Sequence, residues 1–133
     1  MTVWLIVEDD NTTIQLFKAL TGMRGHESLG FLDSQAALDW IDVVDQGHIP
    51  QVLPTIALLD IRMPRVSGIA IAERLRQSPV LRDIDIVFMT AGYVSEVEKQ
   101  AILSQTGAKL LLRKPLPNLA QLLQMLNPSD NKT

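Results

Sequence analysis

Five side chains that could do chemistry together stand at the ends of short apolar stretches. Glu8 and Asp9 follow one such stretch, and Asp60, Thr90 and Lys114 follow three others. Carboxylates brought together repel one another unless a cation joins them, and Mg²⁺ prefers oxygen ligands while keeping waters that a phosphate can displace. With a lysine and a hydroxyl beside it, an aspartate in such a site has the surroundings of a nucleophile that forms an acyl phosphate. No His or Cys lies near these positions, which disfavours zinc, copper and iron.

These side chains can meet only if the intervening elements bring the ends of the stretches together. Short apolar runs predict five strands, at Val3–Val7, Ser28–Leu32, Thr55–Leu59, Asp85–Met89 and Lys109–Leu112. Segments of helical period alternate with them, at about 12–20, 34–44, 68–77, 94–105 and 119–126. The alternation predicts an α/β fold, a doubly wound parallel sheet of five strands with five helices on its two faces. The second strand is the least apolar and is expected at an edge.

The strand ends are therefore expected to converge on one edge of the sheet. In open parallel sheets, ligands bind outside the carboxyl ends of the strands. One connector, Asp45–Pro54, is long and contains Gly47 and two prolines. We expect it to be a tolerated surface loop rather than a surface for a partner, since long insertions cost little.

Composition narrows the class of protein. A chain of 133 residues with 47% hydrophobic and 20% charged residues fits one globular domain, which we expect over residues 1–127, with a polar tail at 128–133. A net charge of −3 gives no general attraction to nucleic acid or to an anionic membrane surface. The chain has no cysteine, and its first residues lack the basic segment and the long apolar run of a signal peptide. A cytoplasmic protein is expected.

Four motifs in the chain resemble those of the response regulator receiver domain, the phospho-accepting module of two-component signalling. They are "VWLIVEDD", "LLDIRMPRVSG", "VFMTA" and "LLRKP", in that order over residues 2–126. The resemblance is to the chemotaxis-regulator type of receiver. It implies a flavodoxin-like sheet with strand order 2-1-3-4-5.

The resemblance also implies a role for each acidic residue. Asp60 would be the phosphorylated residue, and Glu8 and Asp9 would hold Mg²⁺ with it, Asp9 directly and Glu8 largely through water. Arg62 would supply its backbone carbonyl to the metal. Asp10 lies one place beyond the acidic pair, and we interpret it as a loop or helix-cap residue.

Thr90 and Lys114 would act on the phosphoryl group, Thr90 as the switch residue and Lys114 as its ion-pair partner. The bond from Lys114 to Pro115 resembles one that is cis in the family. Leu111 occupies a switch position where the family often has Tyr or Phe, so we expect an output switch that is weaker than the usual coupling of threonine to an aromatic ring or that uses a different path. A long side chain at Arg62 is also less usual, and with Gly92 we expect it to set the lifetime of the phosphorylated state.

The function implied is that of a phosphoacceptor in a phosphorelay, and not of an enzyme with an external substrate. Its partners would be a histidine kinase or phosphotransfer protein, and a downstream protein that contacts the surface from about Val94 to Leu126; a homodimer is left open. Two alternatives remain: a pseudo-receiver that signals without phosphorylation, and a small Mg²⁺-dependent phosphatase. The phosphatase is disfavoured because Arg62 stands where such enzymes need a second aspartate.

Overall fold

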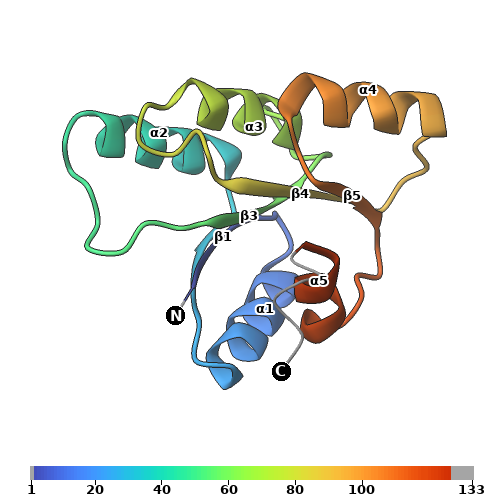
Figure 1. Cartoon of the computed structure of the whole chain (residues 1–133), viewed down its shortest axis with the longest axis horizontal. Coiled ribbons are helices and arrows are strands. Elements are labelled where there is room, and N and C mark those ends of the chain that lie inside the picture. The colour runs from blue at the N-terminus through green and yellow to red at the C-terminus, as the bar shows by residue number, and fades with distance from the viewer. Residues whose placement is uncertain (1, 127–133) are drawn as a thin grey trace.

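The computed structural model describes residues 2–126, and ten elements of secondary structure alternate along them (Figure 1). The strands are β1 (Val3–Val7), β2 (Glu27–Phe31), β3 (Ile56–Asp60), β4 (Asp85–Thr90) and β5 (Leu110–Arg113). The helices are α1 (Asn11–Met23), α2 (Ser34–Asp45), α3 (Gly68–Gln77), α4 (Glu96–Thr106) and α5 (Leu119–Leu126). The polar tail expected at 128–133 lies outside the described residues.

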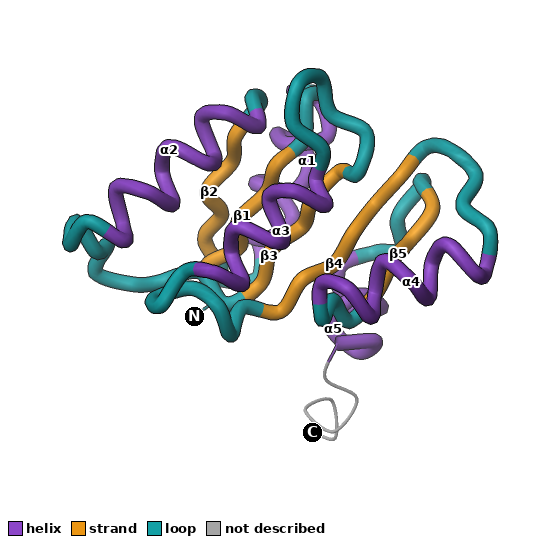
Figure 2. Tube along the Cα trace, turned by 90° about the horizontal axis from the view of Figure 1, so that it is seen from above, coloured by secondary structure: helices purple, strands orange, loops and turns teal. Residues whose placement is uncertain are grey.

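All five strands are parallel and form one sheet in the order β2-β1-β3-β4-β5, which confirms the predicted topology. Helices α2, α3 and α4 cover one face, while α1 and α5 cover the other (Figures 1 and 2). The least apolar strand, β2, lies at an edge as expected, where its residues are only partly buried or exposed.

The central strands are apolar throughout because both of their faces are covered. All five residues of β1 and all five of β3 are buried. Successive side chains of a strand point to opposite faces, so Leu5 and Val7 belong to the core under α2 and α3, whereas Trp4 and Ile6 belong to the core under α1 and α5. This continuous apolar character is what parallel strands require.

Three strands run one residue further than their apolar stretches predict. β3, β4 and β5 end at Asp60, Thr90 and Arg113, one residue past the predicted ends. Strand pairing depends on the backbone, and the pairs Asp60 with Met89 and Thr90 with Arg113 continue the register past the last apolar side chain. Asp60 and Thr90 are therefore the last residues of their strands rather than the first residues of loops.

Helices α1 to α4 all begin at the carboxyl edge of the sheet, each with a capping side chain. The caps are Asp10, Asp33, Ser67 and Ser95, each of which accepts a hydrogen bond from a backbone N–H of the first turn. Such a cap satisfies one of the otherwise free donors at a helix start. The prediction that Asp10 is a helix cap is confirmed, and α4 begins at Glu96 rather than at Val94 because Ser95 is its cap.

A polar network joins the end of α2 to the end of α3. Asp45 accepts hydrogen bonds from Ser78 Oγ at 2.6 Å and from Arg74 Nη2 at 2.7 Å, and Arg74 also binds Asp42 at 2.9 Å. The bond from Ser78, and after it the pairing with Arg74, keeps the pKa of Asp45 below its ordinary value of 3.8. The start of the long connector is thereby fixed to the body of the fold.

We expect Asp45→Ala to lower the free energy of unfolding at pH 7 by about 1 to 3 kcal/mol, because the buried Ser78 and part of Arg74 lose their acceptor. A carboxyl whose pKa is lowered by folding stabilises the fold above its unfolded pKa, and this contribution is lost as the pH falls through the folded value. The difference between variant and wild type should therefore shrink below about pH 3.8. Urea denaturation at several pH values measures it. Asp42→Ala is the control: its carboxylate is about half exposed, and a smaller loss is expected.

Within residues 2–126, no helix has both the length and the apolar character needed to cross a membrane.

Candidate functional site

The polar residues predicted to meet do converge on the carboxyl edge of the sheet. Glu8 and Asp9 follow β1, Asp60 and Thr90 end β3 and β4, and Lys114 follows β5. Their placement follows from the strand register, in which Val7 pairs with Leu59 and Thr90 pairs with Arg113. Residues from four segments that are distant in sequence thus contribute to one site.

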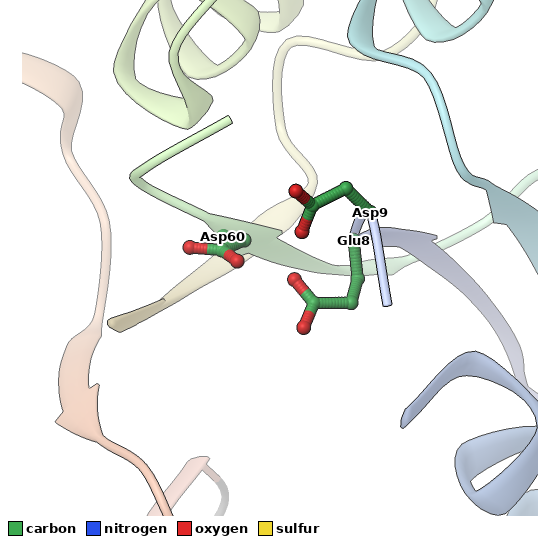
Figure 3. A group of neighbouring side chains, drawn as sticks. All are labelled: Glu8, Asp9 and Asp60. Atoms are coloured by element: carbon green, nitrogen blue, oxygen red, sulfur yellow. The ribbon is translucent and has the colours of Figure 1, made fainter. Parts of the chain in front are cut away.

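Three carboxylates form the centre of the site (Figure 3). Glu8, Asp9 and Asp60 each offer one oxygen, and these oxygens all lie within 4.8 Å of one another. Glu8 is fully buried and Asp60 is 5% exposed, whereas Asp9 is exposed. The site is therefore open to solvent on the side of Asp9 and closed beneath Glu8.

Lys114 links two of these carboxylates. Its Nζ donates to Glu8 Oε1 at 2.5 Å and to Asp60 Oδ2 at 3.3 Å. The peptide bond between Lys114 and Pro115 is cis, as the family resemblance implied. The backbone of Lys114 is also held, because its N–H donates to the carbonyl of Thr90 at 2.8 Å.

The electrostatics of the site reflect a surplus of negative charge in a buried place. Burial, and after it the neighbouring Asp60 carboxyl, raise the pKa of Glu8 from 4.5 to about 7 against the opposing effect of Lys114. Burial lowers the pKa of Lys114, but its hydrogen bond to Glu8 and the charges of Asp60 and Glu8 outweigh this effect, so that its pKa lies above 10.5. Lys114 is therefore positively charged at neutral pH. Its single charge does not neutralise the three carboxyl groups of the site.

The carboxylates also fit a metal ion. Glu8 Oε2 is buried and has no hydrogen-bond partner among residues 2–126, which is costly for a carboxylate oxygen in the interior. In the part of the chain that the structure describes, these carboxylates are the one group of three or more candidate metal ligands. All the ligand atoms are carboxylate oxygens, the donors that hard divalent cations such as Mg²⁺ and Ca²⁺ prefer.

Thr90 lies at the rim of the site but does not bind the carboxylates. It is 1% exposed, and its Oγ1 accepts a hydrogen bond from the backbone N–H of Gly92 at 3.2 Å. Leu111 is further inside, on β5 beside Phe88, and belongs to the core under α3 and α4. By strand alternation Thr90 and Leu111 lie on the same face of the sheet.

Arg62 contacts Asp60 through its backbone and Gly92 through its side chain. Its N–H donates to Asp60 Oδ1 at 3.0 Å, which orients the carboxyl group. Its guanidinium lies over Gly92: a Cβ placed on Gly92 would be 2.6 Å from Arg62 Cζ and Nη1. The side chain therefore runs across to the loop after β4, and among the described residues it makes no hydrogen bond with Glu8.

Gly68 is a residue of the site that the sequence analysis took only as the start of a helix. A Cβ at this position would lie 2.2 Å from the backbone oxygen of Asp60 and 2.8 Å from its carbonyl carbon. The N–H of Gly68 also donates to the carbonyl of Ile61 at 3.1 Å. Gly68 is not among the glycines with positive φ, so close backbone approach is the reason for glycine here. In the sequence, the one indication of this close approach is a glycine directly after Ser67, the cap of α3.

A doubly wound sheet in the order 2-1-3-4-5, with an acidic cluster and a lysine at its carboxyl edge, defines a flavodoxin-like fold whose carboxylates could hold a metal ion. The family model of the response regulator receiver domain matches residues 4–127. The chain belongs to this family.

Its relatives include named regulators from bacteria and an archaeal methanogenesis regulator. The polar-differentiation response regulator DivK of Brucella ovis is 28% identical over 112 residues, which cover 84% of this chain and 83% of DivK. The probable methanogenesis regulatory protein FilR2 of Methanothrix harundinacea is 32% identical over 119 residues, covering 84% of this chain and 71% of FilR2. The BeF₃-activated N-terminal receiver domain of Klebsiella pneumoniae RstA superimposes with a TM-score of 0.72 at 25% identity, covering 94% of this chain and 95% of that one.

Proposed function

We propose that the protein is a phosphoacceptor of a two-component system, and that Asp60 receives a phosphoryl group from the phosphohistidine of a histidine kinase or a phosphotransfer protein. The observation that carries the proposal is the position of Lys114 Nζ, which donates to both Asp60 and Glu8 beside the three carboxylates. A cationic amine next to an aspartate within a cluster of carboxylates is the arrangement that a phosphoryl transfer requires.

In the transfer, a carboxylate oxygen of Asp60 attacks phosphorus while the bond from phosphorus to the imidazole nitrogen breaks, and the electron pair leaves with the imidazole. The product is an acyl phosphate on Asp60. Lys114 pairs with the phosphoryl oxygens, and the N–H of Arg62 orients the attacking carboxyl group through its bond to Oδ1. Hydrolysis of the acyl phosphate returns Asp60 to its original state, so the protein acts only on itself and is not an enzyme with external turnover.

Glu8, Asp9, Asp60 and the backbone carbonyl of Arg62 would hold Mg²⁺. When bound, this ion supplies positive charge to the phosphoryl oxygens in the transition state. The buried Glu8 Oε2, which has no partner among the described residues, and the raised pKa of Glu8 support a cation in addition to Lys114.

The response would begin at Thr90. Its hydroxyl turns from the N–H of Gly92 to the phosphoryl group, which releases the loop before α4 and shifts a two-state equilibrium. A downstream protein in the cytoplasm would recognise the changed surface between about Val94 and Leu126.

Acetyl phosphate with Mg²⁺ tests the proposal directly. We expect the intact mass of the protein to rise by one phosphoryl group, and hydroxylamine to remove it as it removes acyl phosphates. Chelation of Mg²⁺ by EDTA should prevent the uptake; equal uptake in EDTA would contradict the role of the metal. A protein that neither gains mass nor binds beryllofluoride would be a pseudo-receiver that signals without phosphorylation.

We expect Arg62→Asn to speed hydrolysis of the phosphorylated protein by about threefold or more, a change of under about 1 kcal/mol in the barrier at threefold. The reason is that the guanidinium, which lies over Gly92, shields the approach of water from the side of the β4–α4 loop. The decay of the phosphorylated mass with time measures the rate.

Gly92→Ala is the matched variant for Arg62, because its Cβ would displace the guanidinium without removing the charge. The same direction is expected for both variants. An unchanged decay rate in Arg62→Asn would end this explanation.

A further inference from the structure

A pocket of about 300 Å³ lies between β5, the start of α4 and the loop that joins β4 to α4. We call it the β4–α4 pocket. Thr90, Gly92, Tyr93, Val94 and Leu111 are among the residues that line it. Leu111 is 7% exposed, whereas Tyr93 is 72% exposed. The Tyr93 side chain is therefore exposed to solvent beside a pocket that is partly lined by apolar side chains.

The loop that carries Tyr93 lies under the Arg62 guanidinium at Gly92, packs Val94 against the core, and is tied to Thr90 by one hydrogen bond. In the part of the chain that the structure describes, the bond from Gly92 N–H to Thr90 Oγ1 is the one hydrogen bond made by residues 91–94. Any rotation of the Thr90 hydroxyl toward Asp60 breaks this bond. The position of Tyr93, one residue beyond Gly92, is thus coupled to that rotation.

The far end of α4, in contrast, is fixed. The guanidinium of Arg76 donates to the carbonyl of Thr106 at 2.7 Å and to that of Gly107 at 3.1 Å, and it also binds the carbonyls of Arg82 and Ile84 at 2.6 Å. Thr106 is the one residue of α4 that is buried. A change at Thr90 would therefore affect the start of α4 and its loop more than the anchored end of the helix.

We infer that Tyr93 is a hinged cover for the β4–α4 pocket: when Thr90 turns toward a phosphorylated Asp60, the released loop lets the Tyr93 ring fold into the pocket against Leu111. The inference rests on the proposed function for its trigger. Burial of an aromatic ring that is 72% exposed is favoured by the hydrophobic effect, and its hydroxyl can stay at the polar rim formed by Glu96 and Lys99. Leucine at position 111 supplies the apolar surface for the ring.

The sequence supplies a selective probe, because Tyr93 is the single tyrosine of the chain. Protein labelled with 3-fluorotyrosine gives one ¹⁹F resonance from the ring. We expect Mg²⁺ and beryllofluoride to shift this resonance and to reduce its broadening by a soluble nitroxide, since the ring leaves solvent. The ¹⁹F signal of beryllofluoride bound to Asp60 reports the trigger separately in the same spectrum.

The two signals distinguish the possible failures. If bound beryllofluoride appears while the tyrosine resonance keeps its shift and its broadening, the cover is wrong and the proposed phosphoacceptor stands. If no bound beryllofluoride appears, the proposal that Asp60 is a phosphoacceptor is wrong, and the movement of Tyr93 that depends on it is wrong as well.

Leu111→Phe tests where the ring goes. A larger side chain from β5 fills the pocket, so beryllofluoride should still bind while Tyr93 stays exposed to the nitroxide. Thr90→Val should likewise leave the ring exposed, because the residue at the switch no longer has a hydroxyl that can turn. Protection of Tyr93 in Leu111→Phe equal to that in the wild type would overturn its placement in this pocket.

Discussion

Replacing Asp60 with asparagine is expected to reduce phosphoryl uptake from acetyl phosphate to background. The amide keeps the shape of the side chain but has no anionic oxygen to attack phosphorus. It also removes one acceptor of Lys114 and one negative neighbour of Glu8. Asp60 raises the pKa of Glu8, which means that the two carboxylates disfavour each other in the folded protein. Since the substitution removes this repulsion, the variant should fold and be at least as stable as the wild type at pH 7.

Two measurements check this expectation, the intact mass after incubation with acetyl phosphate and the midpoint of urea denaturation. Asp10→Asn is a matched control: it makes the same chemical change one residue beyond the acidic pair, at the cap of α1. It should retain uptake at about the wild-type rate. Equal uptake by wild type and Asp60→Asn would show that another residue accepts the phosphoryl group.

The second large effect is expected from Gly68→Ala. The new Cβ would lie 2.2 Å from the oxygen and 2.8 Å from the carbon of the Asp60 carbonyl, and neither atom belongs to a flexible side chain. Either the start of α3 or the end of β3 must move. We expect a loss of about 3 kcal/mol in the free energy of unfolding, typical of severe overpacking, together with slower phosphorylation, because Asp60 is displaced.

Gly22→Ala provides the control for Gly68→Ala. Gly22 lies within α1, and a Cβ there would meet no atom within 4 Å. Alanine is preferred over glycine inside helices, so this variant should gain up to about 1 kcal/mol. A Gly68→Ala protein as stable as the wild type would mean that the contact with Asp60 relaxes without cost.

The sequence was sufficient to predict the parallel sheet of five strands and the set of polar residues at its carboxyl edge, because both depend on regular patterns. Continuous apolar runs mark buried parallel strands, and polar residues after them must share an edge. Strand ends were less predictable: β3 and β4 continue through Asp60 and Thr90, since backbone pairing does not stop where apolar side chains do.

Side-chain contacts could not be predicted in the same way. The sequence places Glu8 and Asp9 side by side, but only the packing of β1 shows that Glu8 is buried against Lys114 while Asp9 faces solvent. The guanidinium of Arg62 over Gly92 and the backbone of Gly68 against Asp60 depend on how two loops pack, which no local pattern encodes.

The caps of the four helices at the carboxyl edge also shape the electric field around Asp60. The start of a helix carries a partial positive charge of roughly half an elementary charge. Asp10 and Asp33 offset this charge at α1 and α2, and Glu96 and Glu98 offset it at α4. Helix α3 is capped by the uncharged Ser67 and has no acidic residue in its first turn. The one uncompensated positive helix start of these four therefore lies against the backbone of Asp60, where a negative group on this residue would lie within its field.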